Sequence, residues 1–152
     1  MSEQPPDSVS GRRPCTEGEF AGWTYWHGDP FEDRAGPFYE KQLEDGSTMV
    51  AFRAEQRHMN GAGFMHGGCM MTFADGALFS IARKELEDFH AVTLSLSGDF
   101  LEPVYEGSLV EARGEVVRGG GKTIIVAGIV TADGKPSFRF NGIIRKIGKP
   151  RD

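Results

Sequence analysis

The sequence predicts a single α+β domain in which one long helix separates two strands from four later strands. The chain has 152 residues, a length that suits one domain and lets it bury roughly 70% of its unfolded surface. Apolar residues recur at helical spacing over 67–87, whereas the flanking runs are short, β-like and bounded by Gly, Pro and Asp. Because the strand connections are short, we expect antiparallel neighbours.

Composition excludes several classes of protein. Hydrophobic residues make up 39% and charged residues 26% of the chain, which is ordinary for a globular domain. The net charge of −5 argues against a nucleic-acid partner, and no apolar run approaches the ~20 residues of a membrane span. The beginning of the sequence lacks the apolar core of a secretory signal. Cys15 and Cys69 lie in unlike settings without metal-ligand spacing, so we expect a reduced, cytoplasmic protein with no metal.

The first part of the chain differs from the rest. Residues 1–16 are polar with three prolines, and we expect a disordered tail. Residues 17–37 form an aromatic segment that we expect to pack on the domain, with a short helix over 20–26 and a turn-rich loop over 29–37. The main domain is predicted over 38–148.

Strands are expected on both sides of the helix. Residues 38–43 and 48–54 flank an Asp45-Gly46 turn, which is typical of a hairpin. After the helix, β-like runs separated by Gly- and Pro-containing turns cover 91–101, 108–118, 123–132 and 137–146.

The helix has an unusual composition, because Asp75 is the only charged residue over 67–82. A helix on the surface of a monomer would carry a charged outer face, so we expect this one to be covered on nearly all sides. The sheet covers one face, and a partner subunit is the expected cover for the other, which predicts a dimer or a larger assembly. The alternative is that residues 1–37 wrap over the helix.

A candidate site lies where the loop over 60–66 enters this helix. The free backbone N–H groups of a helix N-terminus favour negative charge, and glycine allows a ligand to approach them closely. Asp75 follows two turns later in apolar surroundings. A carboxylate there has few competitors for its lone pairs, which makes it a usable base or nucleophile. Taken singly, each feature also fits a plain glycine-rich cap or a solvated aspartate.

Together these residues are specific. Asn60, His66-Gly67-Gly68 and Asp75 match the pattern N-x5-HGG-x6-D, and the chain over 38–146 resembles the hotdog-fold thioesterases of the PaaI-like, or 4-hydroxybenzoyl-CoA thioesterase, superfamily. The resemblance implies a long helix wrapped by a curved antiparallel sheet, and dimers whose sheets join and often pair into tetramers. It also implies hydrolysis of an acyl-CoA thioester to a carboxylic acid and free coenzyme A, which is then part of the substrate, with no separate cofactor.

The resemblance assigns a role to each motif residue. The Gly67 N–H would polarise the thioester carbonyl, and Asp75 of the other subunit would be the nucleophile or general base. Asn60 would hold the attacking water or the substrate, and His66 would position the carbonyl or the junction. Thr93, in the first strand after the helix, matches a hydroxyl position near the reacting water, although threonine is also simply a good strand former.

Further residues are candidates for binding the substrate. Gly68 would let it approach the backbone. The acyl pocket would be lined partly by Phe64, Met65, Met71, Phe73 and Phe79, which suggests an apolar or aryl acyl group, although such residues are also ordinary core. Arg118 and Lys122, at the mouth of a glycine-rich hairpin, would receive coenzyme A phosphates, although a solvated hairpin tip fits them equally well. The other basic residues that could serve are Arg139, Arg145 and Lys146.

Other functions remain open on the same fold. A non-catalytic acyl-CoA-binding module would have no need of Asp75 in an apolar helix, so that carboxylate favours an enzyme. Hydration or dehydration of acyl thioesters would require a catalytic His elsewhere, because His66 belongs to the junction. A structural oligomer would leave the Asn-HGG-Asp spacing unexplained. Cys69 lies within the apolar helical run, where a cysteine more often packs than reacts.

Overall fold

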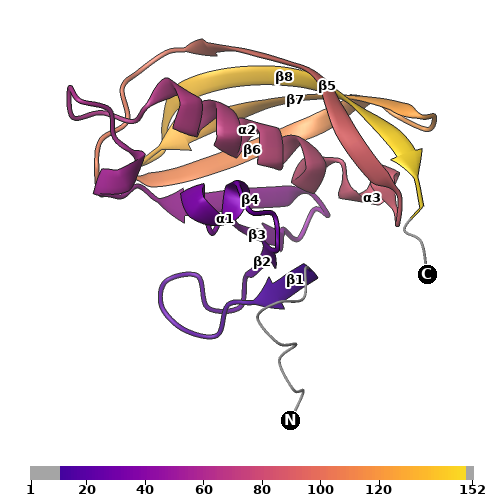
Figure 1. The fold of residues 1–152 in the computed structure, drawn as a ribbon, viewed down its shortest axis with the longest axis horizontal. Coiled ribbons are helices and arrows are strands. Elements are labelled where there is room, and N and C mark those ends of the chain that lie inside the picture. Colours follow the sequence, from indigo (N-terminus) through magenta and orange to yellow (C-terminus); the bar gives the residue numbers. More distant parts are fainter. Residues whose placement is uncertain (1–10, 150–152) are drawn as a thin grey trace.

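The computed structural model describes residues 11–149 and confirms the expected fold class, a long helix held against a curved antiparallel sheet (Figure 1). The strands are β1 (Gly11–Pro14), β2 (Thr24–His27), β3 (Tyr39–Gln42), β4 (Thr48–Arg53), β5 (His90–Phe100), β6 (Leu109–Arg118), β7 (Thr123–Ala132) and β8 (Lys135–Gly148). The helices are α1 (Glu32–Ala35), α2 (Gly67–Ile81) and α3 (Arg83–Leu86), with a single 3-10 turn, η1 (Gln56–His58).

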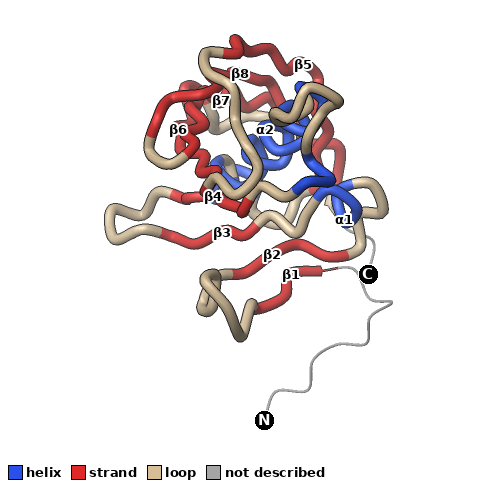
Figure 2. Tube along the Cα trace, turned by 90° about the vertical axis from the view of Figure 1, so that its left-hand side faces the viewer, coloured by secondary structure: helices blue, strands red, loops and turns tan. Residues whose placement is uncertain are grey.

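The sheet has the strand order β1-β2-β3-β4-β6-β7-β8-β5, and all neighbouring strands are antiparallel. The chain leaves β4, runs along the concave face as α2, and returns to the sheet as β5 at the far edge. Strands β6, β7 and β8 then fill the space between β4 and β5. Figure 2 shows the sheet curving around the helix.

The core lies between α2 and the concave face of the sheet. Phe73, Ala74, Ala77 and Leu78 are fully buried, which accounts for the apolar period of this segment. Gly142 of β8 lets the helix approach, because a Cβ there would lie 2.4 Å from Leu78 Cδ1. Any side chain at this position would push the helix and the sheet apart.

The N-terminal segment differs from its predicted structure. Residues 1–10 of the expected tail lie outside the described residues, but 11–14 form a strand, so the expected disorder is wrong there. The short helix expected over 20–26 is also wrong, because Thr24–His27 is a strand paired with β1 and β3. Aromatic and β-branched residues favour a strand once an edge is available to pair with, and β3 provides that edge.

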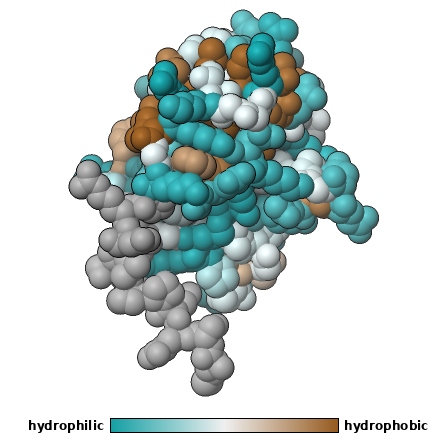
Figure 3. Space-filling model, turned by 90° about the vertical axis from the view of Figure 1, so that its right-hand side faces the viewer, coloured by the Kyte–Doolittle hydropathy of each residue, from teal (hydrophilic) through white to brown (hydrophobic). Residues whose placement is uncertain are grey.

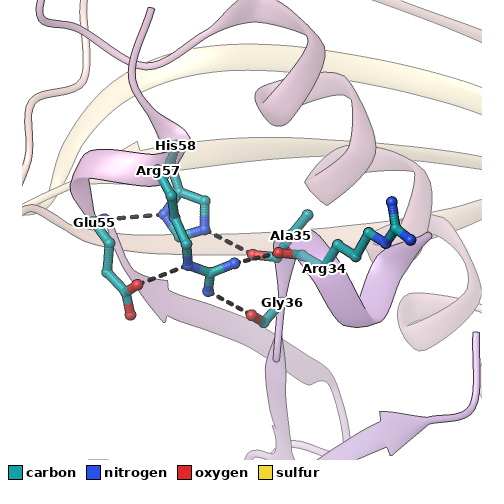
Figure 4. A network of polar contacts seen from close by, with 6 residues as sticks. All are labelled: Arg34, Ala35, Gly36, Glu55, Arg57 and His58. Atoms are coloured by element: carbon teal, nitrogen blue, oxygen red, sulfur yellow. Dashed lines mark hydrogen bonds and ion pairs between the residues drawn. The ribbon is translucent and has the colours of Figure 1, made fainter. Parts of the chain in front are cut away.

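This segment packs on the domain through aromatic side chains and polar contacts. Phe20 is buried and stacks on Tyr39 with ring centroids 4.4 Å apart. The loop expected over 29–37 contains the short helix α1, which lies in contact with α2. Figure 4 shows how the end of α1 is held by the turn η1.

Candidate active site

The junction between the loop and α2 is organised by His66. Its Nδ1 accepts a hydrogen bond from the Gly68 N–H at 2.8 Å, which makes it the N-cap of the helix. Its own N–H donates to the carbonyl oxygen of His58 at 2.9 Å. Because the Gly68 amide is occupied by His66, the Gly67 N–H remains as the first-turn donor without an intrahelical partner. Gly68, expected to bind substrate, therefore has a role in capping.

Asn60 holds the loop that precedes this junction. Its side-chain oxygen accepts hydrogen bonds from the N–H groups of Ala62 at 2.9 Å and Phe64 at 3.3 Å. This turn-forming arrangement is common for asparagine before glycine. The side-chain amide nitrogen is the part of Asn60 that remains suited to hold a water molecule or a substrate.

Asp75 lies in the middle of α2 and is bound by Thr93. The Thr93 hydroxyl donates a hydrogen bond to Asp75 Oδ1 at 2.6 Å, from the neighbouring strand β5. Both residues line a cavity of about 890 Å³, whose apolar wall includes Met71, Phe73 and Phe79. The structure thus brings the expected carboxylate and hydroxyl together beside a space large enough for a ligand.

The remaining motif residues lie apart from Asp75 within one chain. Asn60, His66 and Gly67 are not among the described residues that line the cavity. Gly67 and Asp75 are eight positions apart on one helix, a separation of about 12 Å at 1.5 Å per residue. One thioester carbon cannot contact both groups of the same chain.

The strand β5 connects these two halves of the motif. It runs along α2 in the opposite direction (Figure 1), so that Thr93 near its beginning meets Asp75 and Phe100 at its end meets Gly67. A Cβ on Gly67 would lie 3.3 Å from the Phe100 ring. In the described residues, no strand pairs with the outer edge of β5, and apolar side chains are exposed along it, namely Val92, Leu94 and Phe100.

Of the residues predicted to line the acyl pocket, Met71, Phe73 and Phe79 line this cavity, whereas Phe64 and Met65 do not. Met65 is buried in the core, and its N–H donates to the Val104 carbonyl oxygen at 2.7 Å. Phe64 is exposed beside Tyr105. Within one chain, therefore, the structure does not bring Phe64 and Met65 to Asp75.

The residues predicted to contact the coenzyme A phosphates lie near the C-terminal end of α2, away from the His66 junction. Arg118 ends β6, and Lys122 lies in the turn before β7; both are exposed. Glu85 of α3 holds this turn by accepting a hydrogen bond from the Gly120 N–H at 2.9 Å. Figure 3 views the molecule from this side, where hydrophilic side chains cover most of the middle of the surface. Neither basic residue lines the cavity.

The described residues also bear on cysteine chemistry, metal ligation and membrane spanning. Burial raises the pKa of the Cys69 thiol to about 11, so it stays protonated at neutral pH and is a poor nucleophile. Within residues 11–149, no three His, Cys, Asp or Glu side chains are grouped as metal ligands. In the same part of the chain, no helix has the length and apolar character needed to cross a bilayer.

Sequence reasoning missed the polar residues that the N-terminal segment brings to the cavity. Glu32 of α1 lines it, and burial, with the nearby charges of Asp29, Asp75 and Asp33, raises the pKa of Glu32 to about 7. Nothing in the sequence over 29–37 indicates this, because the segment has no period and resembles a loop.

A buried ion cluster forms another part of the cavity wall. Glu40 of β3 is 5% exposed and contacts both Arg12 of β1 and Arg83 of α3. Burial and the neighbouring Arg83 lower the pKa of Arg12 to about 10.

The fold and the motif define a class of enzymes, the hotdog thioesterases. The model of the thioesterase superfamily matches residues 62–137, which is half of the chain, and the protein belongs to this superfamily. The match begins just before His66 and includes α2, β5, β6 and β7.

Similar proteins come from several bacteria. A "Putative esterase" of Pseudomonas aeruginosa is 32% identical over 88 residues, which cover 57% of this chain and 66% of that protein. A mutant of the phenylacetic acid degradation protein PaaI from Thermus thermophilus is 30% identical, with a TM-score of 0.66 over 78% of this chain and all of that one. A Streptococcus mutans protein solved with acetyl CoA is 25% identical, with a TM-score of 0.67 over 76% of this chain and 93% of that one.

Proposed function

We propose that the protein is an acyl-CoA thioesterase that hydrolyses a thioester to a carboxylic acid and free coenzyme A. The observation that carries this proposal is the hydrogen bond from Thr93 to Asp75 at the wall of an 890 Å³ cavity. Membership of the thioesterase superfamily and the acetyl CoA bound to the Streptococcus mutans neighbour support the substrate class.

In the proposed mechanism, Asp75 acts as general base or nucleophile toward the thioester carbonyl. The Thr93 hydroxyl fixes Asp75 by donating to Oδ1, which leaves the second carboxylate oxygen for water or substrate. The Gly67 N–H stabilises the negative charge that develops on the carbonyl oxygen, as helix-terminal donors do. The thiolate is a good leaving group, so no side chain need protonate it.

We further propose that two subunits share each site. If β5 pairs antiparallel with β5 of a second copy, the beginning of one strand lies opposite the end of the other. Asp75 of the partner subunit then approaches Gly67. Within one chain, Asp75 lies against the beginning of β5 at Thr93, and Gly67 lies against its end at Phe100. The pairing would also cover the exposed Val92, Leu94 and Phe100.

The remaining predicted residues take supporting roles. Asn60 would offer its amide nitrogen to the attacking water, while His66 and Gly68 keep the helix terminus in place. In the dimer, the exposed Phe64, Arg118 and Lys122 would be available to a substrate bound across the subunit boundary, whereas Met65 stays in the core. We place the protein in the cytoplasm, because Cys15 and Cys69 are free thiols.

The substitution Asp75→Asn tests the chemistry. It keeps the size of the side chain but removes the base, and kcat should fall by roughly a hundredfold or more, as expected when general-base catalysis is lost. A thiol-release assay over short, medium, long and aryl acyl-CoA esters measures this. The matched control is Asp88→Asn at the exposed rim of the same cavity, which should keep kcat within about twofold.

Two results would contradict the proposal. If Asp75→Asn folds and hydrolyses thioesters at the parent rate, Asp75 is not the base or nucleophile. If the parent binds a nonhydrolysable acyl-CoA analogue but cleaves no ester in the panel, the protein is an acyl-CoA-binding module.

A mixing experiment tests the shared site. Gly67→Pro removes the proposed N–H donor at the first helical position, where proline is tolerated, and should be inactive alone, as should Asp75→Asn. Refolding the two variants together should restore about a quarter of the parent activity, because half of the dimers are mixed and each keeps one intact site of two. If the mixture stays inactive while native mass spectrometry shows mixed dimers, each site belongs to one chain.

A further inference from the structure

The cavity beside Asp75 carries more acidic than basic side chains. Its acidic residues are Asp29, Glu32, Glu40, Asp75, Glu87 and Asp88, and its basic residues are Arg12, Arg83 and His90. Asp88, at the rim, forms an ion pair with Lys149. Both arginines contact the buried Glu40, and this cluster of two guanidinium groups and one carboxylate keeps a net charge of +1. Even with that cluster counted, acidic side chains outnumber lysines and arginines among the described lining residues, and the ion pairs of the two arginines are with Glu40 and not with Glu32 or Asp75.

Glu32 is the acidic residue placed most closely against the catalytic helix. One of its carboxyl oxygens lies 2.7 Å from the position that a Cβ on Gly76 would occupy. Gly76 directly follows Asp75, and the absence of a side chain there gives the Glu32 carboxyl room to lie on the backbone of α2. Both Glu32 and Asp75 face the same cavity.

The position of Glu32 is built into the fold by the contacts of α1. Asp29 Oδ1 accepts a hydrogen bond from the Glu32 N–H at 3.3 Å. At the other end of α1, His58 Nε2 lies 2.7 Å from the Ala35 carbonyl oxygen, and the Arg57 guanidinium donates to the carbonyl oxygens of Arg34 and Gly36 (Figure 4). The chain that leads from β4 to the catalytic helix thus also anchors α1.

The charge of Glu32 changes in the physiological range. Burial is the main cause that raises the pKa of Glu32 to about 7, and the charges of Asp29, Asp75 and Asp33 add to it. Asp29 and Asp33 belong to the segment around α1, and Asp75 faces Glu32 from α2. As the pH rises through neutrality, the cavity gains a second carboxylate charge beside Asp75.

We propose that Glu32 determines specificity for the acyl group, by making the cavity reject acyl chains that end in a carboxylate and accept uncharged ones. This inference rests on the proposed thioesterase function and names its substrate class. A carboxylate on the acyl chain would be a further negative charge in a partly desolvated space, where like charges repel strongly. The coenzyme A phosphates, for the same reason, lie outside this cavity.

The experiment compares a medium-chain acyl-CoA with the ester of the same chain ending in a carboxylate. The ratio of their kcat/KM values is measured at pH 6 and pH 8 in the parent, Glu32→Gln, Glu32→Asp and the rim control Asp88→Asn. The coenzyme A moiety is common to both esters, and the chain carboxylate is ionised at both pH values. Changes in the ratio therefore report the charge of the protein.

In the parent, preference for the uncharged ester should increase several-fold from pH 6 to pH 8. In Glu32→Gln it should fall by about tenfold at pH 8, the order expected for one charge at close range, and become independent of pH. Glu32→Asp and Asp88→Asn should keep the discrimination. A structural role for Glu32 would lower both kcat/KM values together and leave their ratio unchanged.

Binding of nonhydrolysable thioether analogues of the two esters separates this proposal from the proposed function. If the parent hydrolyses neither ester but its Kd ratio depends on Glu32 as described, the specificity role stands and the hydrolytic function is wrong. If Glu32→Gln has the same ratio and the same pH dependence as the parent in both measurements, Glu32 does not select the acyl group. Failure of the parent to bind either analogue would overturn both proposals.

Discussion

The segment over 11–37 and the region over 38–148 are held in place by different interactions. In the second region, α2 buries Phe73 and Leu78 completely against the sheet, and this packing accounts for the position of the helix. In the first, α1 has no buried residue, and its end is held by hydrogen bonds to Arg57 and His58.

The two regions supply different parts of the proposed site, one the catalytic pair and the other the residues proposed to select the acyl group. The packed region supplies Asp75 and Thr93, whose contact spans α2 and β5. The segment over 11–37 supplies Arg12 and Trp26 from strands β1 and β2, and Glu32 from α1, to the wall of the same cavity. Catalytic geometry thus rests on the packed core, and the charge that Glu32 adds to the cavity rests on the short helix α1, whose end is held by hydrogen bonds to Arg57 and His58.

The largest effect on stability is expected in the packed region. Phe73→Ala removes a fully buried ring that packs edge-on against Phe38 and Phe52, and should lower the free energy of unfolding by about 3–5 kcal/mol. Urea denaturation measures the change. A loss below about 1 kcal/mol would mean that the core tolerates this cavity and that packing does not fix the helix.

A smaller loss of stability is expected from removing His58, which holds the end of α1. The Glu55 N–H donates to His58 Nδ1 at 2.9 Å, so Nε2 carries the proton and donates to the Ala35 carbonyl oxygen. His58→Ala should therefore cost about 2–3 kcal/mol, because it leaves a buried partner unsatisfied. The variant should also lose the selectivity ascribed to Glu32 while Asp75 keeps its activity.

The contribution of His58 to the free energy of unfolding should depend on pH. Burial lowers the pKa of His58 below its ordinary value of 6.5, so the folded protein favours the neutral ring. Stability from His58 is complete above about pH 6.5 and is lost as the pH falls toward the pKa in the folded state. Unfolding free energies at pH 5 and pH 7 should therefore differ less in His58→Ala than in the parent.

The smallest effect is expected from Glu32→Gln, and it should be stabilising. Because the pKa of Glu32 is raised from 4.5 to about 7, its neutral form is favoured by folding, and this stability is lost as the pH rises from about 4.5 through 7. Glutamine stays neutral, so the variant should be more stable than the parent by roughly 1 kcal/mol at pH 8. At pH 4 the two should unfold alike, and a gain of equal size at both pH values would contradict the ionisation of Glu32.

The main elements follow from local pattern. The strands predicted over 48–54 and 123–132 correspond to Thr48–Arg53 and Thr123–Ala132. The helix predicted over 67–87 begins at Gly67 but divides at Ala82 into α2 and α3. Strand and helix periods are set by neighbouring residues, and the sheet and helix bury them in the way the pattern requires.

The N-terminal elements could not be predicted in the same way. The strand Thr24–His27 and the four-residue helix Glu32–Ala35 are too short for a period to show. Each exists because another part of the chain offers a partner, β3 for the strand and the turn at His58 for the helix. The aromatic residues indicated packing on the domain, but not the strand that achieves it.

The sequence by itself determined the class of fold, the Asn-HGG-Asp spacing and the isolation of Asp75 in an apolar helix, since all three are relations between residues close together in the chain. Only the tertiary structure decided that Thr93 binds Asp75, that Glu32 lies on Gly76, and that Gly67 and Asp75 of one chain stand apart. The physical reason is distance along the chain. Glu32 and Asp75 belong to separate segments whose approach depends on how β4, η1 and α2 place them, and no local pattern records that path.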